Sequence, residues 1–162
     1  MKIKLLQLSA ILFFAAAINV QAQTRVGAGL AYGTEIEKMG INVNSQIFVK
    51  ENIAIAPGIV YFFPKNLGSG FDFNWFDINL NGHYYFALNS VQPYALAGLN
   101  FAILSIDSGF GSANNTEIGL NLGGGVNFLI GGKLIPFGEL RIVVGNADQL
   151  VFGGGVRLNI NG

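Results

Sequence analysis

Apolar and polar residues alternate with a period of two along most of this chain, a pattern that extended strands sort onto two faces. In Phe76–Phe86 most even positions are apolar, whereas Asp77, Asn79 and His83 stand at odd positions. The same alternation occurs in Arg25–Gly33, Ile41–Lys50, Glu117–Ile130 and Gln149–Ile160. Since a helix would mix the two classes, these five runs predict strands with one apolar and one polar face.

Three less regular runs complete the set of predicted strands: Ile53–Phe63, Gln92–Ile103 and Leu134–Val144. The first is apolar on both faces and contains Pro57, which has no amide hydrogen to donate, so we expect a β-bulge there. Most runs approach the roughly 9–11 residues that a tilted membrane strand needs. The sequence therefore predicts an all-β fold, an eight-stranded antiparallel up-and-down transmembrane β-barrel.

The composition fits contact with lipid better than it fits a soluble domain. Hydrophobic residues make up 51% of the chain and charged residues 11%, against roughly 25% charged in a typical soluble domain. No stretch reaches the roughly 20 apolar residues of a membrane-spanning helix. A formal charge of zero gives no reason to expect a nucleic-acid partner, and the lack of cysteine excludes disulfides and thiolate metal sites.

The first residues have the pattern of a signal peptide. Lys2 and Lys4 precede the short apolar run Leu5–Ile18, and Val20–Ala22 supplies a cleavage sequence. We expect cleavage after Ala22, which leaves residues 23–162 as one exported barrel domain. The alternative, an uncleaved anchor, is disfavoured because the apolar run is too short to span a membrane.

The predicted connections alternate between short and long, as the turns and loops of outer-membrane barrels do. The short ones are Lys50–Asn52, Ala87–Val91 and Gly131–Gly132. The longer ones are Thr34–Met39, Pro64–Asp72, Leu104–Asn115 and Gly145–Asp148. We expect the short turns to face the periplasm, the long loops to face outside, and Leu104–Asn115 to be the most mobile loop.

Aromatic residues gather at the strand ends, where a barrel in a bilayer carries two girdles. The first set is Tyr32, Tyr61, Phe62, Phe63, Phe73, Trp75 and Phe76, near the longer loops. The second set is Tyr84, Tyr85, Phe86, Tyr94, Phe128 and Phe137, near the short turns. The alternative is that these are the core aromatics of a soluble barrel.

Several segments resemble the small OmpA/OmpX-like outer-membrane β-barrel superfamily, the bacterial outer membrane protein β-barrel domain. They are the signal-peptide pattern, Gln92–Leu99, Pro136–Arg141 and Phe152–Leu158. The resemblance implies a monomer of the cell outer membrane, surrounded by outer-membrane lipid and lipopolysaccharide and inserted by the barrel-assembly machinery. Many members end in an aromatic residue, whereas this chain ends Asn159–Gly162.

Charged residues on the predicted inner face form the one candidate site. With the polar face of each run turned into the barrel and the apolar face turned to lipid, these residues are Arg25, Lys50, Asp77, Glu117, Glu139, Arg141 and Arg157. Four positive and three negative groups nearly balance, as burial requires, because an unpaired buried charge is costly. We expect Glu139 and Arg157 to meet across the last hairpin, and Arg25 to approach the same carboxylate.

No catalytic, cofactor or metal site is predicted. His83 is the only histidine and Asp77 is too far along the same strand to pair with it. Gly123–Gly125 and Gly153–Gly155 lack the lysine and the helix of a phosphate loop. Asp107 and Asp148 lack the further oxygens that calcium needs, and Asn114–Thr116 matches a glycosylation acceptor of a kind that occurs often by chance.

These features favour a non-enzymatic integral outer-membrane β-barrel with a packed polar interior and an envelope-structural or surface-interaction role. A narrow channel for water, ions or small solutes is the first alternative. A lipid-modifying outer-membrane enzyme is less favoured, because His83 is predicted at the periplasmic end, away from the outer girdle. A soluble periplasmic carrier resembling a lipocalin is the fourth possibility.

Overall fold

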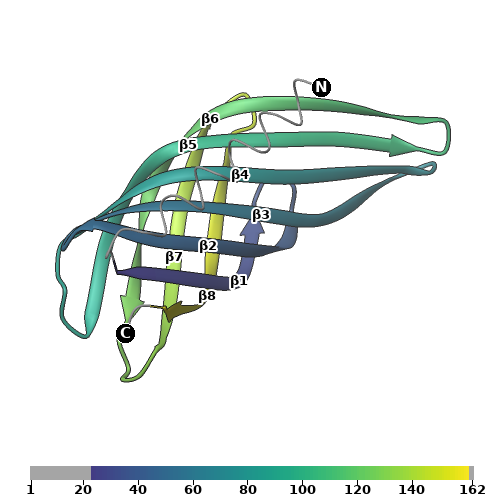
Figure 1. The fold of residues 1–162 in the computed structure, drawn as a ribbon. Coiled ribbons are helices and arrows are strands. Elements are labelled where there is room, and N and C mark those ends of the chain that lie inside the picture. The colour runs from purple at the N-terminus through teal and green to yellow at the C-terminus, as the bar shows by residue number, and fades with distance from the viewer. Residues whose placement is uncertain (1–22, 161–162) are drawn as a thin grey trace, which may run out of the picture.

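The computed structural model describes residues 23–160, which form a single antiparallel sheet closed into a barrel (Figure 1). The expected signal peptide, residues 1–22, lies outside the described residues. The strands are β1 Thr24–Gly33, β2 Lys38–Lys50, β3 Ile53–Gly68, β4 Phe71–Tyr85, β5 Val91–Ser108, β6 Gly111–Phe128, β7 Leu134–Gly145 and β8 Gln149–Asn159.

Each strand pairs with its neighbours in sequence, and β1 pairs with β8 from Arg25–Asn159 to Gly33–Val151, which closes the ring. The predicted fold class, an eight-stranded antiparallel up-and-down barrel, is confirmed. Between residues 23 and 160, no helix has the length and apolar character needed to cross a membrane.

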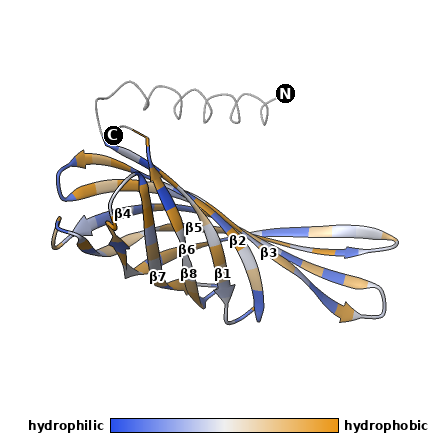
Figure 2. Cartoon of the chain, turned by 90° about the horizontal axis from the view of Figure 1, so that it is seen from below, coloured by the Kyte–Doolittle hydropathy of each residue, from blue (hydrophilic) through white to orange (hydrophobic). Residues whose placement is uncertain are grey.

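The two faces of the barrel wall follow the alternation of the sequence, which Figure 2 displays as bands of hydropathy along the strands. Val26, Leu30 and Tyr32 on β1 are exposed on the outside, whereas Arg25 and Ala31 are buried inside. Because successive side chains in a strand point to opposite faces, the sequence pattern determines the phase, that is, which residues face the interior and which face outward. The predicted phase holds on the six strands for which the sequence predicts one, β1, β2, β4, β6, β7 and β8, except at Lys50 at the end of β2.

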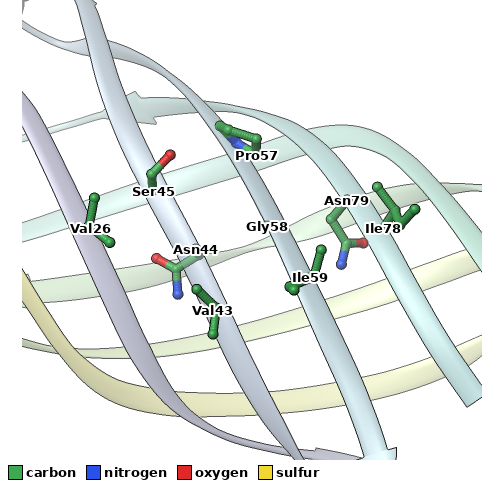
Figure 3. Close-up of a pocket in the computed structure, with 9 residues that line it drawn as sticks. All are labelled: Val26, Val43, Asn44, Ser45, Pro57, Gly58, Ile59, Ile78 and Asn79. Atoms are coloured by element: carbon green, nitrogen blue, oxygen red, sulfur yellow. The ribbon is translucent and has the colours of Figure 1, made fainter. Parts of the chain in front are cut away.

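The predicted bulge at Pro57 is wrong. The β3–β4 register runs through Pro57 without a shift, and the β2–β3 register is the same on both sides of it. Instead, pairing with β2 stops after Asn44–Gly58 and resumes at Ile47–Ile55. On the outer wall a hollow of about 330 Å³ lies at this gap (Figure 3), where the short side chains of Ser45 and Pro57 stand among larger apolar ones.

Two of the predicted loops are long β-hairpins. Much of Pro64–Asp72 and Leu104–Asn115 is strand, and the connecting turns shrink to Ser69–Gly70 and Gly109–Phe110. The β4–β5 pairing continues to Asp72–Asp107, so the two hairpins form one four-stranded sheet that projects beyond the other strands (Figure 1). Backbone pairing between the hairpins satisfies their amides, which the Gly, Ser and Asn composition does not reveal.

The predicted aromatic girdles divide between the two faces of the wall. Tyr32, Tyr61, Phe63, Tyr84, Phe86 and Phe128 point outward at the two ends. Phe76 is half-buried and shares the outward parity of Ile78 on β4. The six remaining members point inward: Phe62, Phe73, Trp75, Tyr85, Tyr94 and Phe137. Strand parity separates the two groups, so neighbours such as Phe62 and Phe63 have different roles.

Candidate functional site: the barrel interior and the projecting sheet

The middle of the barrel interior is a layer of polar side chains. Its amide members are Asn42, Asn44, Gln46, Asn79, Asn81, Asn100, Asn121 and Asn127. Asn121 Nδ2 lies 2.8 Å from Asn79 Oδ1 and 2.9 Å from Asn81 Oδ1, so one amide of β6 binds two side chains of β4. The alternation in the sequence places several of these amides inside but indicates no role for them. The signal for such a role was their recurrence at every second position along the strands.

Four charged residues form a chain of ion pairs within this layer. Arg141 lies 3.6 Å from Asp77 and 3.7 Å from Glu139, and Arg157 lies 3.5 Å from Glu139. All four side chains are nearly inaccessible to solvent. Two guanidinium groups therefore face two carboxylates, which gives this buried chain no formal excess charge.

Arg157 makes the largest number of contacts in the chain of ion pairs. Its Nε donates to Asn44 Oδ1 at 2.8 Å, its Nη1 donates to Asn127 Oδ1, and its guanidinium lies 3.8 Å from the ring centroid of Phe137. The Tyr94 hydroxyl donates to Glu139 Oε2 at 2.7 Å. The Arg157 side chain is thus held by its ion pair with Glu139, by hydrogen bonds and by contact with the face of the Phe137 ring.

Glycine makes room for these large side chains on the inner wall. A Cβ added at Gly27 would lie 2.6 Å from Cγ of Arg157, and one at Gly125 would lie 2.5 Å from the Tyr94 hydroxyl oxygen. Such distances are well inside van der Waals contact, so any side chain here would displace Arg157 or Tyr94. The interior glycines of β1 and β6 therefore have a packing role.

Two predicted members of the interior network lie elsewhere. Arg25 does not reach Glu139: it donates to Gln92 Oε1 at 2.9 Å and lies over the Phe48 ring. Glu117 accepts hydrogen bonds from Asn115 and Asn146 at the base of the projecting sheet and is only half-buried. It lies there because β6 continues past the barrel rim.

The prediction that Lys50 points inward is also wrong, because this residue is exposed at the end of β2. The β2–β3 register shifts between Phe48 and Lys50, which ends the strict alternation one step before this lysine. The positive charge therefore lies at the barrel rim, where water can solvate it.

Apolar clusters close the interior on both sides of the polar layer. Towards the projecting sheet the buried cluster is Ala31, Ile36, Val60, Phe62, Trp75, Ala102, Val143, Ala147 and Val151. Towards the chain termini it is Phe48, Ala54, Tyr85, Tyr94 and Leu96. Between them, a cavity of about 20 Å³ borders the ion pairs, which is room for about one water molecule.

His83 lies inside the wall and not in an open cleft. Its ring stacks on Tyr94 with 4.4 Å between centroids, and its Nδ1 is 2.9 Å from Gln46 Nε2. Within residues 23–160, no three His, Cys, Asp or Glu side chains gather in a way that could hold a metal ion.

The projecting sheet has two different faces. Asp72, Asn74 and Asp107 lie on the side that continues the outer wall, and Asn74 Nδ2 donates to Asp107 Oδ2 at 2.7 Å. On the side that continues the inner wall, Phe73 pairs in register with Ile106. Above the barrel the polarity of the wall is thus reversed, with the polar residues outside.

No family model matches this chain, and no curated protein matches its sequence. The N-terminal β-barrel domain of Pseudomonas aeruginosa OprF superposes with a TM-score of 0.69 at 14% identity, over 86% of this chain and 98% of that chain. Neisserial surface protein A also gives 0.69, at 19% identity over 87% and 98%.

A third structure, the attachment invasion locus protein Ail of Yersinia pestis in complex with the heparin analogue sucrose octasulfate, gives a TM-score of 0.61. It is 15% identical, over 86% of this chain and 100% of that chain. All three similarities cover the whole barrel at low identity, so they concern the fold. The closed ring of eight strands and these neighbours show that the chain has the fold of the small OmpA/OmpX-like outer-membrane β-barrels, as its sequence resemblance predicts.

Proposed function

We propose that this protein is a non-enzymatic integral outer-membrane barrel that is closed to solutes and carries a projecting sheet for contacts outside the cell. In this proposal the signal peptide of residues 1–22 directs export, and the barrel-assembly machinery inserts the chain among outer-membrane lipid and lipopolysaccharide. The single observation that carries the proposal is a filled interior beneath a sheet that extends beyond the barrel.

Membrane insertion is supported by the outer face. Large apolar side chains on all eight strands are exposed there, including Leu30, Ile78, Leu120 and Val156. A soluble monomer rarely exposes a contiguous apolar patch above a few hundred Å². Lipid tails remove this cost, and the same reasoning weighs against a soluble periplasmic carrier.

A closed barrel is favoured over a narrow channel by three successive layers. A solute that entered from the projecting end would meet the Phe62 and Trp75 cluster, then the ion pairs, then the Tyr85 and Tyr94 cluster. Eight-stranded barrels have an interior just wide enough for side chains to fill. The interior side chains here leave little free volume beside the ion pairs.

A lipid-modifying enzyme is disfavoured by the surroundings of the only histidine. His83 is buried between Gln46 and Tyr94, with no open path to a lipid substrate. A general base must come within hydrogen-bond reach of its substrate.

Carbonate extraction and bilayer recordings test the proposal together. After export from a Gram-negative host, the mature chain is expected to stay in the carbonate-resistant membrane fraction. In planar bilayers the purified protein is expected to give no conductance steps. Release by carbonate would refute membrane insertion, and regular conductance steps would favour the channel.

A further inference from the structure

Among residues 23–160, one edge of the projecting sheet is a long, regular strand without a neighbour. The pairing of β6 with β7 stops at Gly119–Gly145, yet β6 continues as strand back to Gly111. Its pairing with β5 runs from Val91–Phe128 to Ser108–Gly111 with no register shift. The segment Gly111–Ile118 therefore presents an unpaired backbone edge, roughly 26 Å long at about 3.3 Å per residue.

The opposite edge of the same sheet is protected against further pairing. There β3 extends beyond its last pair with β2, Gly40–Phe62, and carries Pro64 and Lys65. Its register with β4 also shifts twice, between Phe62 and Lys65 and between Asn66 and Gly68. Proline, lysine and irregular pairing are the features by which natural sheets prevent strand addition. The β6 edge has none of them.

The direction of the backbone groups on β6 follows from the pairing of β5. The Phe86 amide donates to the Pro93 carbonyl, so the polar backbone groups of Pro93 face β4. Since these groups alternate in direction along antiparallel strands, odd-numbered residues of β6 face β5. Ser112, Asn114 and Thr116 therefore direct their amides and carbonyls to the open edge.

The side chains along this edge are compatible with pairing to the same edge of a second copy of the chain. The run Gly111–Thr116 is uncharged, so two copies brought together meet no like-charge repulsion there. The nearest acidic group on β6, Glu117, is occupied by Asn115 and Asn146. Asp107 belongs to β5, so in a joined sheet the two copies of this carboxylate would be separated by both β6 strands.

We propose that the open β6 edge pairs antiparallel with the same edge of a second copy of this chain. In such a pair the two β6 strands run in opposite directions, so the two barrels lie at opposite ends of a joined eight-stranded sheet. If each barrel sits in a membrane, the copies belong to two facing membranes. This inference rests on the proposed function and replaces the expected monomer by a contact between cells.

The experiment uses the mature chain, one copy per phosphatidylcholine nanodisc, so that both membrane faces are accessible. Mass photometry over a concentration series measures the fraction of paired discs. Asn114→Pro removes one edge amide from each copy and leaves the β5 ladder intact, which predicts roughly tenfold weaker pairing. Asn114→Thr keeps the amide and is the matched control, with pairing within about twofold of the unchanged chain.

Thr116→Lys provides a second variant in case the proline variant fails to fold. It adds a charge to the edge without altering the backbone, and it is also expected to weaken pairing. Each variant is first checked for incorporation into nanodiscs. Failure of the unchanged chain to incorporate would contradict the proposed membrane function itself.

If nanodiscs that contain the protein stay unpaired at every concentration, the proposed pairing is wrong. The β6 edge would then be available to an extended segment of another protein. Equal pairing of the unchanged chain, Asn114→Pro and Thr116→Lys would also overturn it, because the contact would then lie elsewhere. Pairing lost in both variants and retained in Asn114→Thr is the supporting result.

Discussion

Arg157 Nη2 lies 3.5 Å from Glu139 Oε2, although Glu139 pairs in register with Gly153 rather than with Arg157. The two residues are thus not the cross-strand neighbours that the sequence predicts. On the neighbouring strand β1, a Cβ at Gly27 would lie 2.6 Å from Cγ of Arg157, so this glycine leaves room for the long arginine side chain. The contact therefore depends on this glycine as well as on the two charges.

Glu139→Gln is expected to destabilise the barrel. The change keeps the side-chain size but leaves Arg157 and Arg141 without one of their two buried carboxylates, which costs about 3–5 kcal/mol. Urea-dependent refolding, followed by Trp75 fluorescence, measures the loss. Adding Arg157→Gln should recover part of it. Glu117→Gln at the rim is the control, with an expected effect below about 0.5 kcal/mol. Equal losses for both glutamines would contradict the assigned burial.

Leu120→Arg is expected to cost roughly 2–4 kcal/mol, because Leu120 is 54% exposed on the outer face. Thr116→Arg, on the same face of β6 but above Gly119 where β7 pairing ends, should leave refolding into lipid vesicles unchanged. The sequence alone predicts that Asn121→Arg is milder unless the arginine overfills the interior. The structure gives no such room, because Asn121 is fully buried between Asn79 and Asn81.

Gly29→Ala should weaken the seam between β1 and β8. A Cβ at Gly29 would lie 2.1 Å from the carbonyl oxygen of Gly154, so the strands must move apart, at about 1–3 kcal/mol. Gly138→Ala is the matched control, since a Cβ there meets no atom within 4 Å. Urea midpoints of the two variants in detergent micelles provide the comparison. A midpoint for Gly29→Ala equal to that of the control would show that the seam is looser than described.

Trp75→Ala should lower stability without opening the barrel. Removing this buried ring, which packs edge-on against Phe62 and Phe73, costs about 3–5 kcal/mol. The ion pairs and the cluster around Tyr85 still fill the interior below it. Planar bilayer recordings should therefore show no conductance for the variant. If Trp75→Ala gave conductance steps and the unchanged chain gave none, the cluster around Phe62 and Trp75 would be the whole barrier to solutes.

Chymotrypsin added to intact cells should cut first after Phe110. This side chain is fully exposed at the tip of the β5–β6 hairpin, whereas Ser108 and Gly111 on either side of the two-residue turn are paired as strands. Strand pairing protects backbone from proteases, so cleavage should be confined to the tip rather than spread over 104–115. Mass spectrometry of the released fragments identifies the site. First cleavage near Gly131 would reverse the orientation of the barrel.

The sequence by itself determined the strands and which face of each points to lipid. Along β4, the alternation of Asp77, Asn79 and Asn81 with Ile78 and Leu80 settles the direction of every side chain, because direction is a local property of extended backbone. Strand number and closure followed from counting such runs, and the two inward carboxylates Asp77 and Glu139 were identified in the same way.

Only the tertiary structure decided the depth at which each residue lies. Glu117 and Glu139 share the inner face in the sequence pattern, yet one lies at the rim and the other is buried beside Arg157. Depth depends on the stagger between neighbouring strands, which is set by pairing around the whole closed ring. For the same reason the sequence could not distinguish the projecting β5–β6 hairpin from a loop, since the backbone partners that keep it extended lie on other strands.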